Sequence, residues 1–571
     1  MSTEVFDLYS ETITAIEPEV PALASHPYVR IVFSDLVTAE FRARKSDPEF
    51  PTSLDSLDVF LHRKGWDTID YAFLFPVATQ QEMRYHGKLL HTLGVRGQKP
   101  YPVKQADIWG INVMNYLQAP ALFSLLQLAG VPALRAERDT HFPIIILGGH
   151  IWPNPLPLSH FYDVMVIGDG EEALHQIAEL RAQIPSDKDR LLEAISNLEG
   201  TFVPGYTAVP AKRVSIDFQH DTYASGSSYL LNRVGAVVLA RGCPHSCAFC
   251  NNTFIGGQYR VKPYTQIMRH IDRLKHHGAK KVMLVAATAS CYRSEGKTAF
   301  DVMAYIKQQG MRVRSMSDRP EFFTEPYLRQ SAVERGKVVL ALESSPRIRT
   351  QVLRKALQEI TLEQAVSAAI AAGIHHIQLY IILALPPISP KVVDFLPDGF
   401  SGEQEEDLEY LTHLGMSIAR RMRKANLKQP EAKPYVKLDC MPFVPAIGTR
   451  LQRVAFPSYQ AYQRSISRLR ALISDAYRDV VEVTAGMDRI TYLLQVFLER
   501  NNAESGIVLW NAWKRAYPAS LDVNRVSEMI ADAGYSESAL RAEFLEKSLP
   551  YKGLIKEEHY GKDGNSTSRR N

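Results

Sequence analysis

The chain has 571 residues, of which 46% are hydrophobic and 22% charged, and its formal net charge is +4. These values are ordinary for a globular protein of two to four domains, and so small a net charge argues against a dedicated nucleic-acid binder. The first residues lack an apolar signal core, no apolar run is long enough to span a membrane, and only five cysteines are present. A cysteine-poor chain of this kind predicts a reducing compartment, and we expect a cytoplasmic protein without membrane contact.

The N-terminal part of the chain predicts strands that alternate with helices. Residues 1–65 have little pattern apart from a helix predicted at 33–41. Apolar runs predict strands at 71–75, 107–114, 143–147 and 163–167, and helices are predicted at 80–93, 120–129 and 171–184. Fully apolar strands that alternate with helices indicate a parallel sheet covered on both faces. We therefore expect an α/β protein with a Rossmann-like, doubly wound domain over 66–215.

Glycines follow two successive strands of this domain. Gly148 and Gly149 come directly after the third strand, and Gly168 and Gly170 come after the fourth. Doubly wound sheets bind ligands at the carboxyl ends of their strands, and glycine lets the backbone approach a ligand or a neighbouring turn closely. These four glycines are therefore candidate ligand-binding residues, although Rossmann-like folds of every kind use such turns.

The segment 230–450 predicts a second domain built from six strand–helix units. Its strands are expected at 235–240, 281–287, 312–318, 338–343, 377–385 and 435–443. This count predicts a partial (β/α)6 barrel, whose reactive groups should sit at the carboxyl ends of the strands. Residues 455–555 predict a helical C-terminal region, and the polar tail 556–571 is expected to be disordered.

The first barrel strand leads into a loop with the spacing C-x3-C-x2-C, formed by Cys243, Cys247 and Cys250. A cubane iron–sulfur cluster normally takes four thiolates, so three leave one iron open, as in reactive rather than structural metal sites. A Cys3His zinc site with His245 is the alternative, but zinc sites usually pair two distant ligand couples and a second couple is missing. Cys291 and Cys440 are expected to be buried apolar side chains, with Cys291 the better candidate for a fourth ligand.

The cysteine loop resembles the cluster-binding loop of the radical S-adenosylmethionine (SAM) superfamily. The resemblance implies a [4Fe-4S] cluster on the three cysteines, SAM chelated to the fourth iron, and an electron donor such as flavodoxin or ferredoxin. In that superfamily the cluster cleaves SAM to a 5′-deoxyadenosyl radical. The resemblance also places Phe249 near the adenine, and Glu343 and Ser344 against SAM. The alternatives are loop packing for Phe249 and capping of the next helix for the turn at Glu343.

Segments such as 112–171 and 342–349 resemble radical SAM proteins with an N-terminal cobalamin-binding domain. This resemblance implies cobalamin at Gly148, Gly149, Gly168 and Gly170, and methyl transfer to an unactivated carbon or similar centre. The D-x-H-x-x-G motif for a histidine cobalt ligand is broken by Phe60, so His62 is expected to be a helix-surface residue and any bound cobalamin to lack a histidine ligand. The alternative is a radical SAM enzyme without cobalamin that modifies a small molecule, RNA or protein. Neither the substrate nor a catalytic acid or base is specified by the sequence.

Overall fold

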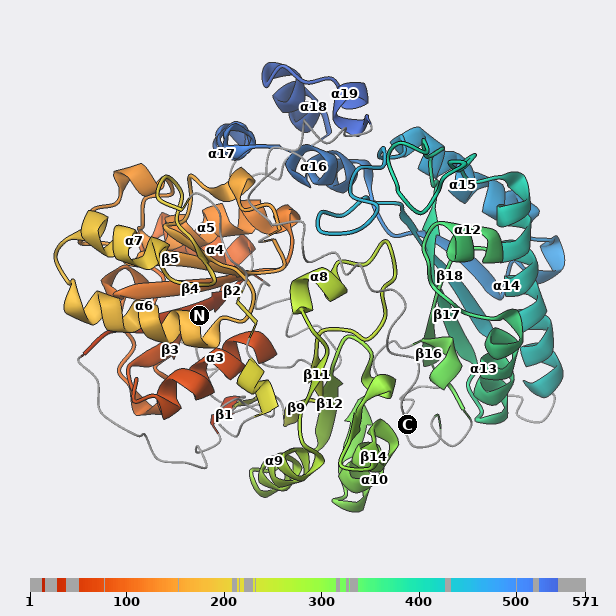
Figure 1. Cartoon of the computed structure of the whole chain (residues 1–571), viewed down its shortest axis with the longest axis horizontal. Helices are drawn as coiled ribbons and strands as arrows, with labels where there is room; N and C mark the ends of the chain where they lie inside the picture. The colour runs from red at the N-terminus through yellow and green to blue at the C-terminus, as the bar shows by residue number, and fades with distance from the viewer. Residues whose placement is uncertain are drawn as a thin grey trace.

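The protein is described here from a computed structural model. It describes residues 13–15, 28–36 and 51–542, apart from 76, 152, 208–212, 215, 220–228, 232, 315–318, 325–327, 329–336, 427–432, 500 and 517–522. The predicted tail 556–571 and most of the segment 1–50 lie outside this range. Figure 1 shows an N-terminal sheet on one side, two further sheets on the other, and C-terminal helices above and between them. None of the described helices is long and apolar enough to cross a membrane.

The N-terminal sheet has six strands in the order β3-β2-β4-β5-β6-β7. Five are parallel and only the edge strand β7 is antiparallel. The strands are β2 (Ile31–Asp35), β3 (Ile69–Tyr71), β4 (Ile108–Val113), β5 (Ile144–Gly149), β6 (Val164–Val166) and β7 (Thr201–Phe202). Side chains of α3 (Thr52–Arg63) and α6 (Glu171–Gln183) share the apolar core on one face, and those of α5 (Ala119–Ala129) share the core on the other. The predicted doubly wound α/β fold is therefore confirmed.

Two predictions in this part are wrong. The helix expected at 33–41 is instead strand β2 as far as residue 35, and the rest of that stretch lies outside the described residues. Ile31 and Phe33 enter the core on one face of the sheet and Val32 enters the core on the other, so the stretch is buried on both sides as a central strand. The helix expected at 80–93 is α4 (Val77–Tyr85), which ends early near Gly87, a residue with a left-handed φ of 62°.

The six predicted barrel strands are all present. The first three are parallel in one sheet, and the last three are parallel in another. They are β9 (Val234–Val238), β12 (Lys281–Val285), β15 (Arg312–Arg314), β16 (Lys337–Glu343), β17 (His376–Leu383) and β18 (Tyr435–Pro442). One apolar core runs through both sheets and the helices outside them, which include α9 (Tyr264–His276), α10 (Ala299–Gln308), α13 (Glu359–Ala371) and α14 (Glu405–Asn426). The two sheets thus form the wall of one open barrel.

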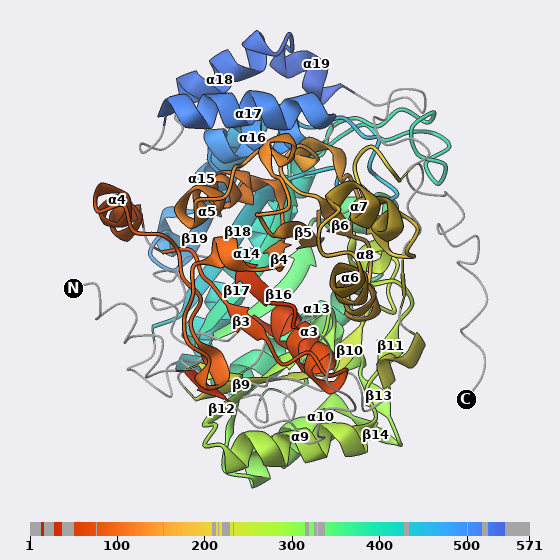
Figure 2. The ribbon, with the colours of Figure 1, turned by 90° about the vertical axis from the view of Figure 1, so that its left-hand side faces the viewer.

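The C-terminal region is mostly helical, as predicted, with one exception. Strand β19 (Val481–Ala485) extends the second barrel sheet in parallel beside β18. The helices are α15 (Tyr459–Leu472), α16 (Arg489–Glu499), α17 (Ala503–Ala516), α18 (Val523–Asp532) and α19 (Glu537–Arg541). Side chains of α16, α17 and α18 join the core on the α5 face of the N-terminal sheet. The C-terminal helices therefore tie the barrel to the N-terminal sheet, as Figure 2 shows from the side.

Candidate functional site

The cysteine loop begins at the carboxyl end of β9. A short strand, β10 (Ala240–Arg241), pairs with β11 (Arg260–Val261), and Gly242 then turns the chain with a φ of 73°. A Cβ atom on Gly242 would lie 2.7 Å from the carbonyl oxygen of Gly257, so only glycine fits this turn. The backbone therefore delivers the three cysteines to the edge where the barrel strands end.

The three cysteine side chains are partly buried and electrostatically coupled. Burial raises the pKa of the Cys247 thiol, although Lys355 and Arg319 act to lower it, and burial raises the pKa of Cys250 to about 11. The Cys247 sulfur accepts a contact of 3.7 Å from the Arg319 guanidinium, and the Thr288 hydroxyl lies 3.7 Å from the Cys243 sulfur. Binding to iron would stabilise the thiolates that burial disfavours.

The zinc alternative requires His245 to join the three cysteines around one ion. Among the residues that the structure describes, no three His, Cys, Asp or Glu side chains gather closely enough to hold one metal ion. His245 instead contacts the sulfur of Cys291, with 3.3 Å between Nε2 and Sγ. A cubane cluster needs no such convergence, because each thiolate binds a different iron. The donor set of Cys243, Cys247 and Cys250 therefore fits a cluster with one open iron.

The other two cysteines differ in their surroundings. Cys440 is fully buried in β18, as expected for an apolar core residue. Cys291 is only partly buried, and its contact with His245 turns it toward the cysteine loop.

The turn after β16 contains the two candidate SAM contacts. Glu343 has a left-handed φ of 74°, and its carboxylate accepts from Lys355 Nζ at 2.8 Å. Ser344 is fully buried, and its hydroxyl has no hydrogen-bond partner in the described structure. The next residue, Ser345, is the one that caps α12 (Pro346–Gln351), by accepting from the backbone N–H of Ile348. Capping of α12 therefore does not explain the positions of Glu343 and Ser344. The buried Ser344 hydroxyl could form its missing hydrogen bond with a polar ligand.

Phe249 lies partly buried against an apolar cluster that includes Ala248, Ile348 and Leu385. This contact agrees with the packing alternative for Phe249.

The predicted glycines line a cavity of about 450 Å³ between the N-terminal sheet and the barrel. Gly148, Gly149, Gly168 and Gly170 contribute to one side. Ala240, Arg241 and Gly242 contribute to the other, together with residues 285–287 at the carboxyl end of β12. The carboxyl edge of the N-terminal sheet thus faces the carboxyl ends of the first barrel strands, next to the cysteine loop.

The four glycines are not equivalent. Gly149 and Gly168 have φ of 112° and 95°, and a Cβ on either would come within 2.2 Å of a backbone carbonyl oxygen. Backbone geometry alone therefore requires glycine at these two positions. A Cβ on Gly148 would meet no atom within 4 Å, so that residue opens directly into space.

Two histidines are relevant to the expectation that bound cobalamin has no histidine ligand on cobalt. His62 lies on α3 with Nδ1 3.3 Å from Asp67, and it does not line the cavity. His150, which follows the glycine pair, does line it.

An ion-pair cluster joins the two walls of this cavity. Arg241 contacts both Asp169 and Glu171, and Arg260 also contacts Asp169. Burial acts to lower the pKa of Arg241, but the two carboxylates outweigh it and raise that pKa. Sequence analysis missed this cluster, although its acidic members stand in the glycine turn and Arg241 precedes the first cysteine by two residues. The cluster fixes the cysteine loop against the N-terminal sheet.

Comparisons with known proteins agree with this arrangement. A family model described as "Radical SAM proteins, N-terminal" matches residues 59–204, and the radical SAM superfamily model matches residues 237–395. The structure superposes on the radical SAM methyltransferase TsrM of Kitasatospora setae, solved with cobalamin and a [4Fe-4S] cluster. That superposition has a TM-score of 0.52 and 12% identity, and it covers 89% of this chain and 99% of TsrM. At that identity the likeness shows the fold.

Curated relatives match over shorter stretches. An uncharacterised protein of Methanocaldococcus jannaschii is 20% identical over half of this chain and 58% of its own length. A ribosomal protein uS12 methylthiotransferase of Chlorobium phaeobacteroides is 26% identical over 18% of this chain and 24% of its own length. The chain thus spans less than two thirds of these relatives. The two radical SAM models together cover just over half of the chain, on either side of the shared cavity, and the chain belongs to the radical SAM superfamily.

Proposed function

We propose that the protein is a cobalamin-dependent radical SAM methyltransferase, acting on an unactivated carbon or a similar centre. The observation that carries this proposal is the 450 Å³ cavity, because it is built jointly from the glycine edge of the N-terminal sheet and the start of the cysteine loop. Methyl transfer requires the methyl donor, SAM and the substrate to lie close together. When bound, the cluster would supply the electron that cleaves SAM, and the corrinoid would supply the methyl group.

The residues of this chain have separate parts in that proposal. Cys243, Cys247 and Cys250 hold the cluster. Glu343 and Ser344 contact SAM from the end of β16, and Phe249 flanks its adenine. The glycine turns at Gly148, Gly149, Gly168 and Gly170 admit the corrinoid. The ion pairs of Arg241 with Asp169 and Glu171 hold the cysteine loop and the glycine turns on opposite sides of the cavity.

The compartment and the electron source belong to the same proposal. A cysteine-poor chain with a reactive iron–sulfur site suits a reducing cytoplasm, where flavodoxin or ferredoxin supplies the electron. The small net charge does not favour a nucleic-acid substrate.

Anaerobic reconstitution with hydroxocobalamin, SAM and a reductant tests the proposal. Mass analysis should detect both 5′-deoxyadenosine and S-adenosylhomocysteine, because SAM serves as radical source and as methyl source. Formation of 5′-deoxyadenosine that is the same with and without corrinoid would favour the alternative, a radical SAM enzyme that uses no cobalamin. Intact SAM would contradict both.

A further inference from the structure

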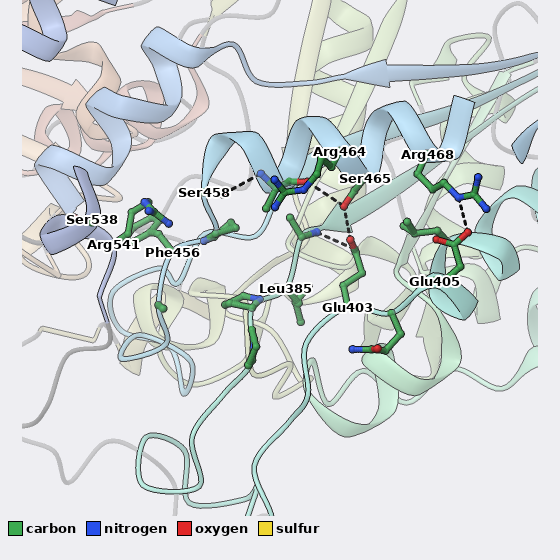
Figure 3. A pocket seen from close by; sticks show the side chains of 18 of the residues that line it. Leu385, Glu403, Glu405, Phe456, Ser458, Arg464, Ser465, Arg468, Ser538 and Arg541 are labelled. Atoms are coloured by element: carbon green, nitrogen blue, oxygen red, sulfur yellow. Dashed lines mark hydrogen bonds and ion pairs between the residues drawn. The ribbon is translucent and has the colours of Figure 1, made fainter. Parts of the chain in front are cut away.

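A second and larger cavity, of about 790 Å³, lies outside the site described above. Its walls come from the loop after β17 (residues 384–387), the start of α14, the first turns of α15, and α19 (Figure 3). It shares no lining residue with the 450 Å³ cavity, and no cysteine lines it. Its volume lies within the range of small-molecule sites, which is about 300–1,000 Å³.

Three arginines line this cavity, against two carboxylates. Arg464 and Arg468 project from α15 and Arg541 from α19, as Figure 3 shows. Arg468 is paired with Glu405. The remaining carboxylate, Glu403, accepts from the Ser465 hydroxyl and from the backbone N–H of Ala384.

Arg464 is the arginine that these carboxylates leave available. It is exposed, and no ion pair is found for it within the described part of the chain. Arg464 therefore has N–H donors available at the cavity. A guanidinium binds phosphate well, because it can donate two parallel hydrogen bonds to it.

The amino end of α15 adds positive potential on the same wall. Ser458 caps this helix by accepting from the Ala461 backbone N–H at 3.0 Å, and both residues line the cavity. The first backbone N–H groups of a helix and its dipole favour an anion. Apolar side chains, including Leu385 and Phe456, complete the walls.

We propose that this cavity binds a phosphate-bearing small molecule, with Arg464 on the phosphate and the apolar side chains against the rest of the ligand. This site is separate from the proposed methyltransferase site and does not depend on it. Guanidinium–phosphate pairing supplies most of the affinity, so that pyrophosphate is a sufficient probe of the site.

Calorimetric titration of the full chain with pyrophosphate tests the proposal. We expect saturable binding to the wild type. Arg464→Gln should weaken it about tenfold or more, because a hydrogen bond to a charged group contributes about 1.5–3 kcal/mol. Arg420→Gln is the matched control, since Arg420 is exposed on α14 and does not line the cavity. No saturable binding, or equal affinity in the Arg464→Gln variant, would overturn the site.

A second variant separates this site from the methyltransferase site. Cys247→Ala should bind pyrophosphate as the wild type does, because the cysteine loop contributes nothing to the cavity wall. A loss of binding in a folded Cys247→Ala protein would place the anion at the cluster loop and contradict the proposal.

Discussion

At the scale of single residues, the three cysteines carry the most specific chemistry. Cys247→Ala should lose bound iron and SAM cleavage, because two thiolates cannot hold a cubane that already lacks its fourth protein ligand. Cys291→Ala is the matched control, since it removes a partly buried thiol that contacts the loop without belonging to the motif. Iron analysis and 5′-deoxyadenosine formation measure the effect. Full iron content in Cys247→Ala, or iron loss in Cys291→Ala, would show that the ligands are assigned wrongly.

Glu403 predicts a pH dependence of stability. Burial raises the pKa of its carboxyl to about 7, and nearby Asp407 adds to the raise while Arg347 opposes it. The folded protein therefore keeps the Glu403 proton up to about pH 7, whereas the unfolded chain releases it near pH 4.5. The protonated carboxyl stabilises the folded protein at low pH, and this stabilisation is lost as the pH rises through 7.

Glu403→Gln, which is neutral at every pH, should remove that loss. Its free energy of unfolding relative to the wild type should rise between pH 5 and pH 8, by about 1–3 kcal/mol. The amide can still accept from Ala384 N, and the Ser465 hydroxyl can turn to accept from it. Urea unfolding at several pH values measures the difference, and a constant difference across the range would refute the assignment.

At the scale of elements, the ion pairs of Arg241 hold the cysteine loop against the amino end of α6. Glu171 is buried, so Arg241→Met should cost about 2–3 kcal/mol of stability by leaving that charge without its partner. The double variant Arg241→Met/Glu171→Gln should recover part of the loss, which a double-mutant cycle of denaturant unfolding would show. Strict additivity of the two single variants would mean that the pair does not couple the elements.

The sequence predicted the six barrel strands, but it missed strand β19 and assigned strand β2 to a helix. Strands β9, β12 and β17 are mostly apolar runs, and β16 and β18 alternate buried residues with less buried ones, so their patterns identify them as strands. Strand β19 reads Val-Glu-Val-Thr-Ala, is short, and stands among helices, so local pattern gave little signal. Strand β2 was read as part of a helix, because its apolar residues continue into Leu36 and Val37.

The site itself was only partly predictable. The cysteine spacing is local, and so the metal ligands could be proposed from eight residues. The cavity wall and the Arg241–Glu171 pair join groups 70 residues apart in the chain, and only the tertiary fold brings them together. The 790 Å³ cavity depends likewise on α19 meeting the loop after β17.

At the scale of the whole molecule, the N-terminal sheet and the barrel meet with their functional edges face to face. Helices α16 to α18 pack against the N-terminal sheet from the far end of the chain, which closes the molecule into one body (Figures 1 and 2). The 450 Å³ cavity is lined by residues from both the N-terminal sheet and the barrel. A corrinoid bound in this cavity would lie beside the cluster loop. Among the described residues that line the cavity, His150 is the histidine whose side chain could reach the corrinoid.

The sequence predicts that a bound corrinoid has no histidine ligand on cobalt. The electron paramagnetic resonance spectrum of the Co(II) form tests this without reference to activity. A spectrum free of nitrogen superhyperfine splitting is expected. Splitting that disappears in His150→Ala would instead identify His150 as the ligand and correct the prediction.

The most direct test of the whole account is the cobalt content of protein purified anaerobically from cells grown with hydroxocobalamin. Gly148→Phe should abolish cobalt and keep iron, since its side chain would point into open space in the cavity without straining the backbone. Gly148→Ala is the control and should keep both metals. About one cobalt per chain in the wild type, lost only in Gly148→Phe, is the result that the account predicts; a wild type without cobalt, or cobalt retained in Gly148→Phe, would contradict it.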